Sequence, residues 1–343
     1  MTTSASNDPV LQLILSGVFP DQTVSKVETV EQGNRKKTQI IRFGSADPVV
    51  VQRTSNLAVG RTEAYLLEAL RTQTSLPVPR LIASGTNHTV SWFVTELLAG
   101  SDLHRVFTTL NVDTQQQIVA SLGYYLAELH EKFQFNNHGP LVVDDNCLVT
   151  QKSIETPQSN PNTPDRKMAT DQSNRSHDQW REWFLEFGKK SIERLPAPFD
   201  SIREELLQTI TDTTTERTPT PRLFPWDLRP GNALIHNNSI TAILDWESPL
   251  AADCALSVAK TEYLVADWYV SPDEAPVLRD AFRNGYSSHR ELPHVQPGHR
   301  LAAIANTAVD SKGSITNPQY PPVDRTTAIS FHQDSLTRVL DAC

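Results

Sequence analysis

The residues best suited to do chemistry lie close together, in the run Pro225-Trp226-Asp227-Leu228-Arg229-Pro230-Gly231-Asn232 and at Asp245, which ends the next apolar run. Two carboxylates and a carboxamide supply the hard oxygen ligands that Mg²⁺ prefers. Phosphoryl transfer needs such a set, since it depends mainly on positioning the reactants and neutralising charge. We therefore expect a magnesium-dependent phosphoryl-transfer site in this part of the chain.

A β-hairpin between Asn232 and Asp245 would hold these oxygens in place. Asn237-Asn238 separates two apolar runs, and asparagine tolerates the positive φ that a two-residue turn needs. Counting back from this turn sets Asn232 opposite Ile243, and Asp245 lies two residues, ~7 Å, beyond that partner. Asn232 and Asp245 should therefore emerge at the same end of the hairpin, beside the loop that holds Asp227.

The spacing also suggests a role for each of the three side chains. Asp-Leu-x-x-x-Asn, a hairpin and then an apolar run ending in Asp reproduce the spacing of the kinase catalytic loop and its metal-binding aspartate. Asp227 would accept the proton of an attacking hydroxyl, while Asn232 and Asp245 would hold the metal against a triphosphate. The alternative is a capped turn followed by a chance surface aspartate.

These motifs resemble a known family. Residues 225–235, followed by Leu244-Asp245-Trp246-Glu247, are similar to the aminoglycoside phosphotransferase family, which is similar to choline, homoserine and fructosamine kinases. Residues 122–130 are similar to the first large helix of the family's C-terminal lobe. The resemblance implies Asp227 as catalytic base, Asn232 and Asp245 as Mg²⁺ ligands, and ATP or GTP as the phosphoryl donor.

Two positions depart from the family's pattern. Pro225 stands two residues before Asp227, where the family usually has a histidine that braces the loop. Arg53 stands at the usual nucleotide-contacting lysine, and arginine can still pair with phosphates. The missing histidine leaves a second function open: a catalytically weak or inactive pseudokinase that binds nucleotide as a sensor or scaffold.

A supporting ion pair is also predicted from periodicity. Arg53 shares one face of a strand at residues 49–53 with two valines, because side chains alternate along a strand. Glu63 shares one helix face with three leucines, and a carboxylate buried there needs a partner. Arg53 is the nearest candidate, and the pair would position phosphates as the lysine–glutamate link does in kinases. The alternative is a half-exposed Glu63 beside a solvated Arg53.

The chain divides into two composition regimes. Roughly the first hundred residues read as antiparallel strands with one helix, and a polar turn is expected at residues 32–37, where one glycine and three cations could approach nucleotide phosphates. The rest is mainly helical. One helix is expected to start at Asp113 and to share one apolar face among Ile118, Leu122, Leu126, Leu129 and Phe133. Another, from Gln179, is expected to turn four aromatic residues inward: Trp180, Trp183, Phe184 and Phe187.

The resemblance implies an α+β, two-lobed protein-kinase-like fold. The two regimes then place a nucleotide-binding N-lobe at 1–98 and a helical C-lobe at 99–343 that holds the catalytic loop and acceptor site. Glu96 to Leu98 would form the hinge that contacts the nucleotide base. Residues 150–178, with almost no apolar content, are expected to be a mobile insertion.

Composition limits the partners. A formal net charge of −9 disfavours nucleic acid as a partner, since phosphates would be repelled. The longest apolar runs fall short of the ~18 residues that a membrane span needs, and the N-terminus lacks a secretory pattern. Three widely spaced cysteines fit a reducing compartment, so we expect a cytoplasmic protein without a membrane or nucleic-acid partner.

The acceptor is expected to be a small-molecule alcohol or amino-alcohol. Glu262, Asp267, Asp273 and Glu274 follow the metal-binding segment, where the resembling family places its acceptor pocket. An acidic pocket would favour a cationic acceptor, whereas the alternative is a solvated acidic face. A protein acceptor is disfavoured, because residues 246–255 run almost directly into a helical pattern and leave little room for an activation segment.

Overall fold

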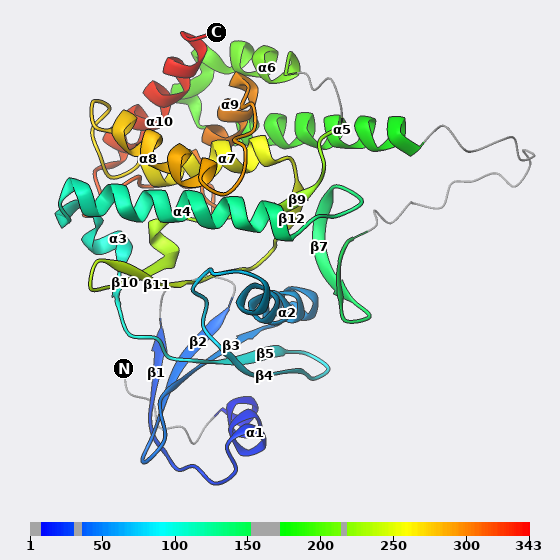
Figure 1. The fold of residues 1–343 in the computed structure, drawn as a ribbon, viewed down its shortest axis with the longest axis vertical. Helices are drawn as coiled ribbons and strands as arrows, with labels where there is room; N and C mark the ends of the chain where they lie inside the picture. The colour runs from blue at the N-terminus through cyan, green and yellow to red at the C-terminus, as the bar shows by residue number, and fades with distance from the viewer. Residues whose placement is uncertain (1–7, 31–35, 152–171, 214–217) are drawn as a thin grey trace, which may run out of the picture. The chain divides into compact units, whose positions relative to one another are not determined.

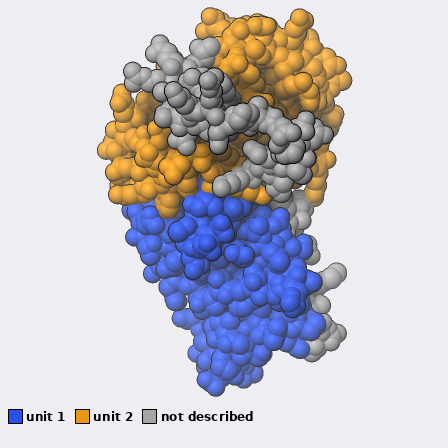
Figure 2. Space-filling view, turned by 90° about the vertical axis from the view of Figure 1, so that its right-hand side faces the viewer, with its two compact units in different colours: residues 1–101, 141–149, 232–248 blue, residues 102–140, 150–231, 249–343 orange. Residues whose placement is uncertain are grey.

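The computed structural model describes residues 8–30, 36–151, 172–213 and 218–343. They form two compact units, which Figure 2 colours separately. Unit 1 is made of residues 1–101, 141–149 and 232–248, and unit 2 is made of residues 102–140, 150–231 and 249–343. The segment 232–248, which the sequence placed in the C-terminal lobe, groups with the N-terminal strands.

Unit 1 is built on a five-stranded antiparallel sheet (Figure 1), whose strand order is β1-β2-β3-β5-β4. The expected antiparallel strands are therefore confirmed. The strands are β1 (Val24–Val30), β2 (Lys37–Phe43), β3 (Val49–Thr54), β4 (Leu81–Thr86) and β5 (Ser91–Glu96). The turn expected at residues 32–37 falls mostly on residues outside the described ranges.

Two helices cover opposite faces of this sheet (Figure 1): α1 (Pro9–Val18) and α2 (Leu57–Gln73). Asp8 caps α1 by accepting the backbone N–H of Leu11 at 3.1 Å. One apolar cluster joins α1 to the sheet, and the valines that face it in β3 are Val49 and Val51. Because side chains alternate along a strand, this cluster fixes which β3 residues point toward α1.

A second small hairpin belongs to unit 1, formed by β10 (Ala233–His236) and β11 (Ser239–Ile243). A backbone hydrogen bond joins it to the segment between α2 and β4, since the N–H of Ile243 donates to the carbonyl of Pro77 at 2.7 Å. The hydroxyl of Thr241 donates to the carbonyl of Ala99 at 3.1 Å. A Cβ on Gly100 would lie 3.0 Å from Leu234, so the hairpin and this segment pack closely.

Unit 2 is mainly helical. Its larger helices are α4 (Val112–Lys132), α5 (Gln172–Glu193), α6 (Arg203–Thr211), α7 (Cys254–Glu262), α8 (Ala275–Ser287), α9 (Pro297–Ala308) and α10 (Arg325–Leu340). Shorter helical pieces are α3 (Leu103–Val106), η2 (Phe107–Thr109), η3 (Ala197–Ile202), η4 (Pro230–Asn232) and the π-helical turn η5 (Tyr263–Asp267). Its β9 (Arg222–Phe224) pairs with β12 (Leu250–Ala252), which also pairs with the start of β7 (Gly139–Asp144), the strand before β8 (Cys147–Thr150).

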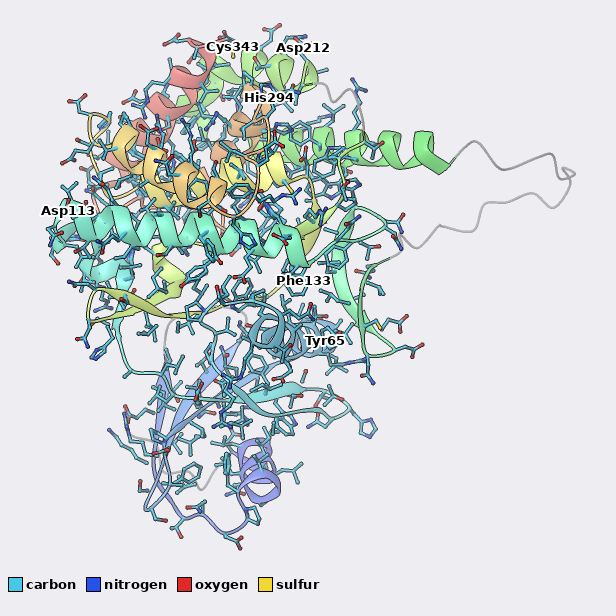
Figure 3. All side chains as sticks on the ribbon, viewed as in Figure 1. Tyr65, Asp113, Phe133, Asp212, His294 and Cys343 are labelled. Atoms are coloured by element: carbon cyan, nitrogen blue, oxygen red, sulfur yellow. The ribbon has the colours of Figure 1, made fainter. Side chains whose placement is uncertain are left out.

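The long helix α4 confirms the helical spacing read from the sequence. The five apolar residues expected on one face are all buried, down to Phe133, which directly follows the helix (Figure 3): Ile118, Leu122, Leu126, Leu129 and Phe133. The helix starts earlier than expected, because Asn111 accepts the N–H of Thr114 at 2.9 Å and acts as the cap. α4 packs tightly against α8, where Gly123 and Gly285 leave room for backbone.

The expected mobile insertion at 150–178 lies mostly outside the described residues. Its last part differs from the expectation, because α5 already begins at Gln172. The expected burial of the aromatic face of this helix is confirmed for Trp180 and Phe184, which are 2% and 3% exposed. Trp183 and Phe187 stack on each other at 5.2 Å between ring centroids. Among the described residues, no helix is long and apolar enough to span a membrane.

Candidate active site

The turn of the β10–β11 hairpin has the predicted form. His236 pairs with Ser239, so two residues make the turn. Asn237 and Asn238 have φ of 49° and 61°, both in the left-handed region that asparagine tolerates. The two-residue turn predicted from the asparagine pair is confirmed.

The predicted register is wrong by one residue at the open end of the hairpin. Ile243 pairs with Ala233 rather than with Asn232, because β11 carries an extra residue, Thr241, in a bulge. The carbonyl of Asn232 instead accepts the N–H of Leu244 at 2.7 Å. Asn232 and Asp245 still lie at the same end of the hairpin. The bulge therefore shifts the pairing by one residue but keeps these two residues together.

Asp245 follows this end with a backbone that few residues adopt. Its φ is 64°, in the left-handed region where a residue with a side chain costs of order 1–3 kcal/mol. Its side chain is 41% exposed, and Lys36 Nζ lies 2.7 Å from its Oδ1. A strained residue held by a neighbouring cation is a feature that functional sites retain.

Lys36 is the centre of a charged cluster within unit 1. Its ammonium donates to both carboxylate oxygens of Glu63, at 2.7 and 2.9 Å, and lies 3.7 Å from Glu247. Lys36 is 9% and Glu63 2% exposed, and Glu63 also accepts the N–H of Trp246 at 3.2 Å. Burial lowers the pKa of Lys36, but the attraction of Glu63 and Asp245 outweighs burial and raises it above its ordinary value. The ammonium therefore stays charged.

The predicted pairing of Glu63 with Arg53 is wrong. Arg53 points to the α1 face of β3 with Val49 and Val51, while Glu63 lies on α2, across the sheet. Its guanidinium instead makes two hydrogen bonds to Asp8, at 2.7 and 2.6 Å, and one to Gln39. The alternative of a half-exposed Glu63 beside a solvated Arg53 is also wrong, since Glu63 is 2% and Arg53 7% exposed.

Lys36 was missed as the partner of Glu63. It precedes β2, in the predicted polar turn whose three cations were expected to approach nucleotide phosphates and not to pair with Glu63. Lys37 of β2 is the cross-strand neighbour of Arg53 in β3, the position where the lysine was expected. Lys36 lies one residue before Lys37. The sequence did contain a signal, a short cationic run just before the strand next to β3. The periodicity of β3 alone could not reveal it, because the cation comes from the segment before a neighbouring strand.

A divalent cation fits the chemistry of this cluster. Glu63, Asp245 and Glu247 set three carboxylates against the single ammonium of Lys36 within 4 Å, leaving an excess of negative charge. In the described ranges, no three His, Cys, Asp or Glu side chains are arranged to hold a metal by themselves. An ion here would therefore use Asp245 with the Asn232 carboxamide, plus water and phosphate oxygens, as Mg²⁺ commonly does.

Asp227 belongs to unit 2, on the segment between β9 and η4. Lys260 Nζ of α7 lies 3.6 Å from its Oδ1, and the Asp227 side chain is 37% exposed. Burial lowers the pKa of Lys260, although the charge of Asp227 opposes the shift. Lys260 also donates to Asn306 at 3.1 Å. Since Asn232 and Asp245 belong to unit 1, the convergence of all three oxygens on one cation stays a prediction.

Aromatic packing holds the Asp227 loop where the resembling family uses a histidine. The Trp226 ring lies 4.2 Å from Lys260 Nζ and 5.5 Å, between centroids, from the Phe224 ring. Pro225 between them is buried. Lys260 was missed in the sequence because a single lysine in the helical run Cys254–Glu262 reads as a solvated position, whereas it is 3% exposed.

The predicted hinge residues lie at the end of β5. Glu96 is its last residue, and its Oε1 accepts the N–H of Arg80 at 2.8 Å. The next residue, Leu97, donates its N–H to the carbonyl of Pro48 at 3.3 Å, and Leu98 is half-buried. The contact of Glu96 and Leu98 with a nucleotide base stays a prediction.

The acidic residues after the hairpin form neither an acidic pocket nor one solvated face. Glu262 is 1% exposed and accepts from Arg283 at 2.7 Å and from Arg300 at 2.5 Å. Asp267 is buried and ion-paired with Arg279. Of the other two acidic residues, Glu274 accepts from Ser271 at 2.8 Å and Asp273 is exposed. Arginines on α8 and α9 neutralise the two buried carboxylates, which periodicity along one segment does not reveal.

The antiparallel sheet with its helix, the hairpin with its aspartate and the helical second unit define a protein-kinase-like α+β fold, as expected. A family model described as the phosphotransferase enzyme family (APH) matches residues 44–294. The chain therefore belongs to this family of phosphotransferases. No curated protein matches the chain.

Solved structures share the fold at low sequence identity. The ternary complex of the aminoglycoside phosphotransferase APH(4)-Ia with ADP and hygromycin B is 13% identical, with a TM-score of 0.61, covering 98% of this chain and 99% of that one. A provisionally assigned fructosamine-3-kinase from Haemophilus somnus 129PT is 16% identical, with a TM-score of 0.55 and 96% coverage of both chains. The GDP complex of an aminoglycoside 2'-phosphotransferase-IIIa variant is 12% identical, with a TM-score of 0.57, covering 98% and 96%.

Proposed function

We propose that the chain transfers the γ-phosphoryl group of ATP or GTP to a hydroxyl of a small alcohol or amino-alcohol, with Mg²⁺. The observation that carries the proposal is the Lys36 cluster at the open end of the hairpin. In kinases, a lysine paired with a helix glutamate positions the phosphates and a nearby aspartate holds Mg²⁺. Here the buried Lys36 ammonium pairs with Glu63 of α2 and contacts Asp245 after the hairpin. Membership of a phosphotransferase family supports the same reaction.

In the proposed reaction, the acceptor oxygen attacks the γ-phosphorus and the bond from that phosphorus to the β–γ bridging oxygen breaks. Asp227 takes the hydroxyl proton, and the nucleoside diphosphate leaves. Asn232 follows Asp227 by five positions, so the chain keeps their Cα atoms within about 18 Å in any arrangement of the units. Lys260 Nζ, 3.6 Å from Asp227 Oδ1, would keep this carboxylate oriented.

Lys36 has two roles in this proposal. Without nucleotide it neutralises Glu63 and Asp245; with nucleotide it donates to phosphate oxygens while Glu63 holds it in place. Asp245 and Asn232 would then hold Mg²⁺, which supplies neutralisation of the charge on the phosphates. Glu96 to Leu98 would contact the base, and the structural role found for Arg53 removes it from the phosphate-binding set.

The acceptor proposal compares the ligand of one relative with the charge of this chain's own acidic residues. APH(4)-Ia binds hygromycin B, an aminoglycoside, in its solved complex. In this chain, Glu262 and Asp267 are neutralised by arginines, so the carboxylates that would attract a strongly cationic acceptor are already paired. We therefore propose a small alcohol with at most one amine over a polycationic antibiotic.

The direct test is turnover of γ-labelled ATP and GTP with Mg²⁺ and a panel of alcohols and amino-alcohols. Wild type should form a labelled ester, and Asp227→Asn should lose at least about a hundredfold in kcat with nucleotide affinity little changed. Asp334→Asn, an exposed aspartate of α10, is the matched control and should keep its activity. Nucleotide binding without turnover across the panel would favour the pseudokinase alternative and overturn the proposal.

A further inference from the structure

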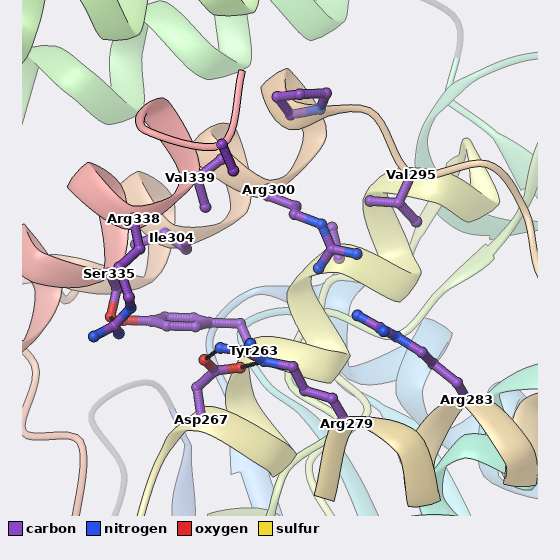
Figure 4. A pocket seen from close by; sticks show the side chains of 13 residues that line it. Tyr263, Asp267, Arg279, Arg283, Val295, Arg300, Ile304, Ser335, Arg338 and Val339 are labelled. Carbon is purple, nitrogen blue, oxygen red and sulfur yellow. Dashed lines mark hydrogen bonds and ion pairs between the residues drawn. The ribbon is translucent and has the colours of Figure 1, made fainter. Parts of the chain in front are cut away.

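A pocket of about 310 Å³ lies within unit 2, enclosed by α7 with η5, α8, α9 and α10 (Figure 4). Four of its lining residues are arginines, and they reach it from three helices: Arg279, Arg283, Arg300 and Arg338. Its volume is at the lower end of the range for small-molecule sites. The pocket was not foreseen from the sequence, because its cations come from segments far apart in the chain.

The pocket carries an excess of positive charge. Glu262 offsets Arg283 and Arg300, and Asp267 offsets Arg279. Two buried carboxylates and the exposed Asp280, 4.0 Å from Arg283, therefore offset four guanidinium groups, and among the described residues Arg338 forms no ion pair. It donates to the Ser335 hydroxyl at 3.1 Å and is exposed. An uncompensated guanidinium beside three held in place by buried carboxylates is suited to bind an anion.

The arginines are held in position yet remain accessible. Arg279, Arg283 and Arg300 are 32%, 36% and 30% exposed, so each buries part of its stem and keeps donors toward the pocket. Each ion pair uses only one or two of the three guanidinium nitrogens. Figure 4 shows the guanidinium groups of Arg283 and Arg300 directed to the same space.

The rest of the lining is apolar. Val295, Pro297, Ile304 and Val339 contribute carbon surface beside the Tyr263 ring. A bare inorganic ion would leave this surface wet, whereas an organic molecule would cover it. The lining therefore suits a small carbon skeleton that carries a multiply charged oxyanion, because guanidinium groups bind phosphate and carboxylate oxygens in pairs.

The pocket is distinct from the surroundings of Asp227. On α7, Ala259 lines the pocket, whereas the next residue, Lys260, contacts Asp227, about 100° around the helix. On α9, Arg300 and Ile304 line the pocket, while Asn306 on another face accepts from Lys260. The same two helices therefore border both places with different faces.

We propose that this arginine pocket is a binding site for a small organic phosphate ester or polycarboxylate, separate from the phosphoryl-transfer site. The ligand's oxyanion would be bound by the outward nitrogens of Arg283 and Arg300, while Arg338 would add positive charge from the other side of the Tyr263 ring (Figure 4). The ligand's carbon skeleton would cover the apolar wall. This proposal does not depend on the catalytic one, because it needs neither nucleotide nor turnover.

The test is calorimetric titration of the full chain at physiological ionic strength with ribose 5-phosphate and with citrate, and with ribose as the uncharged probe. We expect at least one anion to bind and ribose not to bind. Which anion binds decides between a phosphate ester and a polycarboxylate. Absence of binding by both anions would overturn the proposal.

Variants locate the binding. Arg338→Glu should weaken the binding of the anion about tenfold or more, since it exchanges a positive charge of the pocket for a negative one. Arg338 forms no ion pair among the described residues, and the buried Asp267, whose pKa its charge lowers, keeps Arg279 as its ion-pair partner. Arg325→Glu, an exposed arginine at the start of α10, is the matched control and should bind like wild type. Lys36→Met should also bind normally. Equal affinities in Arg338→Glu and Arg325→Glu would place the anion elsewhere and overturn the proposal.

Discussion

The ammonium of Lys36 donates to both carboxylate oxygens of Glu63, so the residue before β2 and helix α2 are joined by one buried ion pair. Arg53, the partner predicted from the sequence, points to the other face of the sheet and pairs with Asp8 there. The cation that pairs with the helix glutamate therefore comes from the segment before β2 and not from β3, while Glu63 lies on the helix as expected.

Replacing Lys36 tests its role in positioning phosphates. Lys36→Met should raise the nucleotide KM about tenfold or more and lower kcat, because the variant loses a charged donor to the phosphates. Lys37→Met is the matched control: it changes the next residue, which is 53% exposed and pairs with Asp8, and should stay within about twofold of wild type.

Destabilisation of Lys36→Met alone would give a similar loss, since Glu63 would be left buried without its cation. The double variant Lys36→Met/Glu63→Met separates the two effects, as it should regain stability in urea unfolding but not nucleotide affinity. Recovery of both in the double variant would show that Lys36 acts only through the fold.

Arg53 is expected to stabilise unit 1 and not to contact nucleotide. Arg53→Met should lower the free energy of unfolding by about 2 kcal/mol or more, because Asp8 and Gln39 lose a buried charged partner. Hydrogen bonding to Arg53 holds the pKa of Asp8 well below its usual range, so removal of Arg53 should raise the pKa of Asp8. The nucleotide KM, measured well below the melting temperature, should be unchanged. A tenfold rise in KM with normal stability would restore Arg53 to the phosphate-binding set.

The strands, the main helices and the order of the site residues were predictable because each leaves a local pattern. Alternation gave β1 to β3, the helical spacing of five apolar residues gave α4, and the asparagine pair gave the turn at 237–238. These features depend on neighbours along the chain, and such neighbours are visible in a sequence.

What the sequence did not predict depends on neighbours in space. The bulge at Thr241 shifted the hairpin by one residue, and nothing in the residue types marks it. Arg53 lies on the face of β3 that packs against α1, so it pairs with Asp8. Arginines from α8 and α9 neutralise Glu262. A charged residue's partner is chosen by packing of whole elements, so periodicity predicts that a partner is needed but not which one it is.

The contact between α4 and α8 predicts a position-dependent effect of a single methyl group. A Cβ on Gly285 would overlap the carbonyl of Ala120, so Gly285→Ala should destabilise the protein by about 3 kcal/mol through forced separation of the helices. Gly17→Ala is the control, because nothing lies within 4 Å of its Cβ position in α1. It should be neutral or stabilising by about 0.5–1 kcal/mol. Urea unfolding of both variants checks this, and equal effects would contradict the packing.

Acid should destabilise the protein through buried histidines, of which His332 is the best defined. Its Nδ1 lies 2.8 Å from the Tyr263 hydroxyl and its Nε2 lies 2.8 Å from the Thr316 carbonyl. A neutral ring satisfies both, with Nε2–H donating to the carbonyl and Nδ1 accepting from the hydroxyl. Burial lowers the pKa of His332 from 6.5 to about 4.

Because the unfolded chain then binds more protons than the folded chain between pH 6.5 and about 4, stability falls as pH falls through this window. Replacement by a side chain that does not titrate should remove that share of the slope, up to about 1.4 kcal/mol per pH unit. His332→Gln should therefore be less stable than wild type at pH 7.5, with a difference that narrows toward pH 4.5. Urea unfolding at several pH values measures both curves. Parallel curves would mean that His332 is protonated equally in the folded and unfolded chain, which its two hydrogen bonds and its burial oppose.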